Sequence, residues 1–176
     1  MANNILNTFY KYYDSKDYIK AEKCIRSIIQ QGDHSAWSYT KLSSVLYEQK
    51  RYRSALRFSI RAYEIDKDNP ITIWHYAAAL FMNDEFNKAI ILWKTLIKQG
   101  ELSLGKRSTT MGILWGRRIV TDCYYWIGKS NYCNNNDSES FRFLNKYIEL
   151  RRNGNPSLYK IVDAKRLIVE MGPLTA

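Results

Sequence analysis

The chain has 176 residues, of which 45% are apolar and 25% are charged. This length suits a single domain, and this composition is too apolar for an intrinsically disordered protein. The 27 basic and 17 acidic residues give a formal net charge of +10, which favours acidic partners through long-range attraction without identifying one.

The start of the chain shows no targeting signal. Residues 1–18 contain no basic stretch followed by an unbroken apolar run, so no signal peptide is readable there. No segment offers the roughly 20 apolar residues of a membrane-spanning helix, so we expect a cytoplasmic protein with no membrane contact. Cys24, Cys123 and Cys133 are an odd number without a CxxC pair, so we expect reduced, mostly buried thiols and no metal site.

A repeat dominates the first part of the chain. An aromatic residue, two intervening residues and an alanine recur every 34 residues, at 18–21, 52–55 and 86–89. A period of this length predicts helix hairpins, in which a first helix ends before the aromatic residue and a second begins at it. The predicted hairpins lie at about 2–33, 36–69 and 70–100.

Helix punctuation agrees with these bounds. Asp33 and Ser35 can cap the helix that enters at Trp37, and Pro70 suits the first turn of a later helix.

A fourth hairpin follows at about 117–152, displaced by an insertion at about 101–117. Gly128 and Ser140 are the small residues of this hairpin. Ser140 takes the place of the repeated alanine and follows Ala89 after 51 residues instead of 34. A last helix, at about 157–171, would cover the apolar face that an end repeat leaves exposed.

This pattern resembles the tetratricopeptide repeat (TPR), in a small stand-alone form. The period matches, and Gly128 stands where the family favours glycine, whereas Phe9 and Leu96 replace small residues. The resemblance implies an all-α, right-handed α-solenoid of about four TPR helix hairpins, with an insertion before the fourth and a C-terminal capping helix, as one TPR domain over residues 1–176. It also implies that the first helices line a concave groove and the second helices form a convex back.

The repeat register places aromatic residues in the groove, beyond those that hairpin packing needs. Tyrosine and tryptophan are enriched at protein interfaces, because they bury much area at little cost in rotamer entropy. Packing in the core is the alternative for each of them. The predicted partner-binding residues of the groove are Tyr10, Tyr13, Trp37, Tyr47, Trp74, Phe81, Tyr125, Lys129 and Tyr132.

The insertion adds basic residues. Arg107, Arg117 and Arg118 are predicted to contact a partner, because insertions in repeat arrays often map to binding faces. The alternative is that the insertion only extends the next helix and packs over the third hairpin through apolar residues such as Met111 and Trp115.

No residue pattern indicates catalysis. Residues 100–108 resemble a phosphate-binding loop, but they follow a helix and carry Arg107 where a serine or threonine is needed. We expect no enzymatic activity, no cofactor and no small-molecule substrate. Many TPR domains bind C-terminal carboxylates through a clamp of Lys, Asn and Arg. At the matching sites of this chain only Lys41 and His75 could serve, so an amphipathic or extended segment fits better.

Arg53, Arg57 and Arg61 lie four residues apart and form a basic stripe on the second helix of the second hairpin. A solvated convex face is the first interpretation, and nucleic-acid binding is the alternative.

The sequence therefore predicts a non-catalytic module that binds an acidic or amphipathic segment of another protein, as an adaptor or chaperone. The alternatives are an immunity or inhibitor protein that neutralises a toxin or enzyme, and a basic protein associated with nucleic acid.

Overall fold

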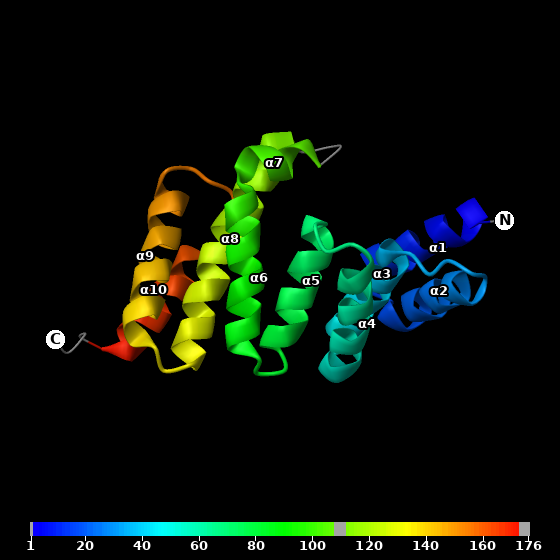
Figure 1. Cartoon of the computed structure of the whole chain (residues 1–176), viewed down its shortest axis with the longest axis horizontal. Coiled ribbons are helices and arrows are strands. Elements are labelled where there is room, and N and C mark those ends of the chain that lie inside the picture. Colours follow the sequence, from blue (N-terminus) through cyan, green and yellow to red (C-terminus); the bar gives the residue numbers. More distant parts are fainter. Residues whose placement is uncertain (1, 108–111, 173–176) are drawn as a thin grey trace. The chain divides into compact units, whose positions relative to one another are not determined.

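The computed structural model describes residues 2–107 and 112–172, and every regular element in these ranges is an α-helix (Figure 1). The chain divides into two compact units, Met1–Asp84 and Glu85–Ala176. Unit 1 contains α1 (Ala2–Asp14), α2 (Tyr18–Gln30), α3 (Ala36–Glu48), α4 (Tyr52–Ile65) and α5 (Pro70–Phe81). Unit 2 contains α6 (Phe86–Gln99), α7 (Glu101–Lys106), α8 (Gly112–Cys133), α9 (Asp137–Arg152) and α10 (Ile161–Met171).

Polar side chains cap the N-termini of several helices. Ser35 accepts a hydrogen bond from the backbone N–H of Ser38 at 3.3 Å. Asn69 accepts one from the N–H of Ile71 at 3.0 Å, directly before Pro70 in the first turn of α5. These side chains satisfy N–H groups that the first helical turn leaves without a backbone partner.

The turns that follow the first helices share one backbone conformation. Lys16, Lys50, Asp84 and Asn135 have φ values of 60, 60, 61 and 55°, in the left-handed region. In each case the backbone N–H donates to the carbonyl three residues earlier, over 2.9 to 3.1 Å, which closes the preceding helix end. The first three turns are 34 residues apart and the fourth follows after 51, so the backbone reproduces both the period and its interruption.

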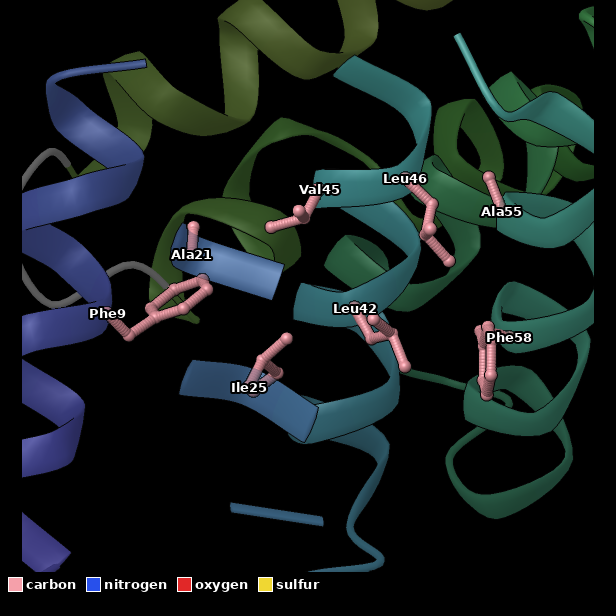
Figure 2. Packing of buried hydrophobic residues seen from close by; sticks show 8 residues of the cluster. All are labelled: Phe9, Ala21, Ile25, Leu42, Val45, Leu46, Ala55 and Phe58. Atoms are coloured by element: carbon pink, nitrogen blue, oxygen red, sulfur yellow. The ribbon is translucent and has the colours of Figure 1, made fainter. Parts of the chain in front are cut away.

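The core of unit 1 forms where paired helices approach closely at small residues. Ala21 and Ala55 are fully buried, and the hydroxyl of Ser43 on α3 donates to the carbonyl of Ala55 on α4 at 2.9 Å. Figure 2 shows Phe9 of α1 directed towards Ala21 of α2, where the large ring takes the place of the expected small residue. The buried cluster consists of Phe9, Ala21, Ile25, Leu42, Val45, Leu46, Ala55 and Phe58.

Glycines set the helix packing in unit 2. A Cβ added at Gly128 of α8 would lie 2.7 Å from the side chain of Leu144 on α9, which explains glycine in this hairpin. A Cβ at Gly116 of α8 would lie 2.0 Å from the carbonyl oxygen of Glu101, so α7 packs directly on the α8 backbone. Residues 112–117 of the predicted insertion thus form the first turns of α8, while residues 108–111, including Met111, lie outside the described residues.

The last helix begins at Ile161 rather than near residue 157, because the residues before it are held by α8 and α9. Asp122 of α8 accepts hydrogen bonds from the hydroxyl of Ser157 and, at 3.2 Å, from the N–H of Leu158. The Tyr147 hydroxyl of α9 donates to the carbonyl of Tyr159 at 2.6 Å. These bonds fix a non-helical segment, which bends at Leu158 and Tyr159, in place of a helical turn.

Asp122 is a fully buried carboxylate, and burial raises its pKa from 3.8 to about 6. The hydrogen bonds from Ser157 and Leu158 and the charges of Arg118 and Arg151 act in the opposite direction without cancelling this effect. The folded state therefore holds this proton more tightly than the unfolded state does, so the stability that the protonated Asp122 contributes is lost as the pH rises from about 3.8 through about 6.

Replacement of Gly116 by alanine should lower the free energy of unfolding by about 3 kcal/mol, because the added methyl group meets the rigid backbone at Glu101. Urea denaturation followed by circular dichroism measures the loss. The control is Ser103→Ala on the exposed face of α7, which should change stability little. Equal stability of the two variants would contradict the close approach of α7 and α8.

Replacement of Asp122 by asparagine should remove one contribution to the pH dependence of the unfolding free energy. Between about pH 7.5 and about pH 4.5, the unfolding free energy of the wild type should rise relative to that of the variant by about 2 kcal/mol, because only the wild type regains a proton on its buried carboxyl. Denaturant titrations at several pH values measure this difference. The unfolding free energy of the exposed Asp84→Asn variant should change with pH as that of the wild type does. If the unfolding free energy of Asp122→Asn also follows the wild type, Asp122 is not the source of the pH dependence.

Candidate functional site

Two aromatic rings and a lysine from two hairpins meet on the first helices of unit 1. The rings of Tyr10 on α1 and Trp37 on α3 lie 6.5 Å apart, and the Lys41 Nζ of α3 lies 5.3 Å from the Tyr10 ring centre. Tyr10 is 37% exposed, and Trp37 and Lys41 are half-buried. We call Tyr10, Trp37 and Lys41 the first-helix face.

The lysine of this face has no acidic partner among the described residues of unit 1, where no ion pair includes it. Burial lowers the pKa of Lys41, and the negative charge of Asp14 opposes this shift. The neighbouring His75 of α5 has its pKa lowered to about 4 by burial and then by the charge of Lys41, so it is neutral at physiological pH. The first-helix face therefore combines exposed ring surface with a single amine.

Two other predicted residues of unit 1 tie its helices together. The Tyr13 hydroxyl lies 2.6 Å from the Ser44 hydroxyl, and burial raises the pKa of Tyr13. Tyr47 packs edge to face on Tyr52, with ring centres 5.5 Å apart, and burial raises its pKa to about 12. Both tyrosines thus have structural contacts within unit 1.

The predicted residues of α5 differ in exposure. Trp74 is half-buried, so part of its surface is open, whereas Phe81 is buried with 8% of its surface exposed. Helix α5 contacts α3, the first helix of the second hairpin, through Thr72, whose hydroxyl lies 3.4 Å from that of Thr40 on α3.

In unit 2, C-terminal residues contact two of the three predicted groove residues of α8, Tyr125 and Tyr132. Tyr125 is 6% exposed, and its ring stacks on Tyr159 with centres 4.5 Å apart and planes inclined by 8°. Tyr132 donates a hydrogen bond to Glu170 of α10 at 3.0 Å, and the Lys129 Nζ lies 5.1 Å from the Trp126 ring centre. The sequence predicted that the last helix covers an apolar face of the end repeat, but it placed Tyr125 in the open groove, because the repeat register does not indicate where Tyr159 lies.

The three predicted arginines have different environments. Arg107 and Arg117 are exposed, and Arg117 forms an exposed ion pair with Glu101 at 3.4 Å. Arg118 is half-buried and close enough to Asp122 to lower its pKa. Partner binding by these and the other predicted residues stays a prediction.

Neither a metal-holding cluster nor a candidate membrane-spanning helix is found in the described parts of the chain. Residues 2–107 and 112–172 contain no group of three or more His, Cys, Asp or Glu side chains arranged to hold a metal ion. Within the same ranges, no helix combines the length and apolar character needed to cross a bilayer. Residues 101–106 of the segment that resembles a phosphate-binding loop form α7, directly after α6.

Comparison with known proteins gives matches among solved structures only. No protein-family model matches the chain, and no curated protein sequence does. YrrB, described as a TPR protein with an unusual peptide-binding site, is 16% identical over 84% of this chain and 68% of its own, with a TM-score of 0.68. The MamA RS-1 ArsTM double mutant is 9% identical over 97% of this chain and 93% of its own, also with a TM-score of 0.68.

A further match is MamA from Desulfovibrio magneticus RS-1, residue 41 to its end, with 10% identity and a TM-score of 0.52 over 88% of this chain and 97% of that one. These identities are too low to transfer a function, but the agreement in backbone structure confirms the predicted all-α arrangement of helix hairpins. The chain has the fold of the tetratricopeptide-repeat proteins.

Proposed function

We propose that the chain is a non-catalytic protein-interaction module that binds a segment of another protein on the first-helix face. The observation that carries this proposal is the meeting of Tyr10, Trp37 and Lys41 from two hairpins, with ring surface left open to solvent. Such a face suits an amphipathic segment, whose apolar side chains cover the rings while an acidic group meets the amine.

The chemistry of the face supports a protein segment in particular. Aromatic rings with a polar edge bury a large area while losing little rotamer freedom, and they recur as the strongest contacts of protein interfaces. Trp74 on α5 would extend the apolar surface along a bound segment, since it too is only half-buried. The peptide-binding site in the description of YrrB adds support by analogy of fold alone.

Only some of the predicted partner contacts in unit 2 are accessible to a partner. Tyr125 is left out, because its ring is occupied by Tyr159. Arg107 and Arg117 are kept as exposed contacts for an acidic part of the partner, since the ion pair of Arg117 with Glu101 is exposed and therefore weak.

Tyr10→Ala and Trp37→Ala should each weaken peptide binding by about tenfold or more, because each removes ring surface at the centre of the face. Peptides enriched by panning a displayed random library on the wild-type protein provide the probe, and fluorescence anisotropy measures their affinities. We expect the enriched peptides to be amphipathic. Thermal unfolding of each variant checks that the fold is retained.

The matched control is Phe141→Ala, since Phe141 of α9 is 38% exposed and lies in unit 2. It should leave the affinity unchanged. Enriched peptides that bind the Tyr10 and Trp37 variants as tightly as the wild type would refute the proposed face. If the natural partner proves to be an enzyme that loses activity in the complex, the chain acts as an inhibitor, and otherwise as an adaptor or chaperone.

A further inference from the structure

We propose that a second site, a basic pocket between α2, α3 and α4 of unit 1, binds the carboxylate of an acidic side chain on a partner protein. The cavity has a volume of about 200 Å³, and the residues that carry the argument are Arg26, Gln30, His34, Tyr39, Phe58 and Arg61. We call it the arginine pocket. It shares no residue with the first-helix face, so the two proposals stand independently.

Three rings form a row along the pocket. His34 and Tyr39 have ring centres 6.2 Å apart with planes inclined by 25°, and Tyr39 and Phe58 have centres 6.2 Å apart with planes inclined by 16°. The His34 Nδ1 lies 3.0 Å from the Tyr39 hydroxyl, which fixes the two rings to each other. Phe58 itself belongs to the buried cluster of unit 1 (Figure 2), so the row rests on the hydrophobic core.

Arginine side chains lie on this row of rings. The Arg61 Cζ is 5.9 Å from the Tyr39 ring centre and 5.7 Å from that of Phe58. The Cζ atoms of Arg57 and Arg26 are 5.0 and 5.6 Å from the Phe58 ring centre. A guanidinium that lies against a ring loses conformational freedom, while the N–H donors in its plane stay available to a carboxylate. The rings therefore pre-organise the donors that an acidic side chain needs.

The charge around the pocket is not balanced within unit 1. Glu22 is shared between Arg26 at 2.8 Å and Arg51 at 2.7 Å. Among the described residues, no carboxylate forms an ion pair with Arg57 or Arg61. Arg57 and Arg61 are exposed, but each lies against the Phe58 ring, and Arg61 also lines the cavity, which distinguishes it from an arginine that contacts only water. The excess positive charge calls for an acidic ligand.

The volume of the arginine pocket and the burial of its rings favour an acidic side chain over a nucleic acid as the ligand. Small-molecule sites usually enclose roughly 300–1,000 Å³, so this cavity suits a single side chain better than a nucleotide. Single-stranded nucleic acid needs open ring faces on which bases stack, whereas Phe58 is 7% exposed and arginines lie against it. The pocket thus fits aspartate or glutamate in an acidic protein segment.

The test uses a fluorescein-labelled peptide of alternating glutamate and serine, with binding measured by anisotropy at low salt. Arg61→Gln should weaken binding by about tenfold, because it removes the guanidinium that lies against the Tyr39 and Phe58 rings and offers its N–H donors to the carboxylate. Arg53→Gln is the matched control: Arg53 lies on the same helix, is exposed and does not line the pocket, so its loss should weaken binding by less than about twofold. Arg61→Lys, which keeps the charge and loses the planar donors, should behave like Arg61→Gln.

Three outcomes would overturn the proposal: no binding of the glutamate peptide, equal losses for the Arg61 and Arg53 variants, or equal binding of a peptide with glutamine in place of glutamate. Tighter binding of a single-stranded oligonucleotide of the same length, with the same dependence on Arg61, would replace it by a nucleic-acid site. Circular dichroism checks the fold of each variant. A Tyr10→Ala, Trp37→Ala double variant should bind the glutamate peptide like the wild type. The experiment therefore tests the arginine pocket independently of the first-helix face.

Discussion

Close approach of helices at positions without large side chains is the constraint on which the rest of the structure depends. The buried Ala21 and Ala55 let the second helices lie against the first, and Gly128 leaves room for Leu144 in the last hairpin. Packing at this distance is possible only where the side chain is small, so the spacing of these residues sets where each hairpin closes. Everything exposed on the first helices, including Tyr10 and Trp37, is positioned by this packing.

Much of the fold could be predicted because its signals are local and periodic. The small residues mark the hairpins, and Ser35 and Asn69 begin helices with hydrogen bonds that their side chains commonly form. The left-handed turn residues could not be predicted from their type, since Lys16 and Lys50 carry a Cβ that disfavours this conformation. The start of α10 at Ile161 was also missed, because it depends on hydrogen bonds from residues far away in the sequence.

The candidate site could be predicted in part, because the repeat also determines on which face of a helix a residue lies. A repeat register indicates which face a residue lies on, and the structure brings Tyr10 and Trp37 together as the register suggests. The register does not indicate what covers that face, so it gave no warning that Tyr159 lies on Tyr125. It likewise shows Arg61 only as part of a charged stripe, since the rings beneath it come from different helices.

The ring of Tyr159 has a consequence for the association of copies. A last hairpin with its rings uncovered would offer a surface on which the first hairpin of a second molecule could stack, and such head-to-tail contacts can continue into filaments. In this chain, hydrogen bonds with Asp122 and Tyr147 hold the segment that carries Tyr159 in a non-helical form before α10. Because Tyr159 lies on Tyr125, the Tyr125 ring is not open for such stacking.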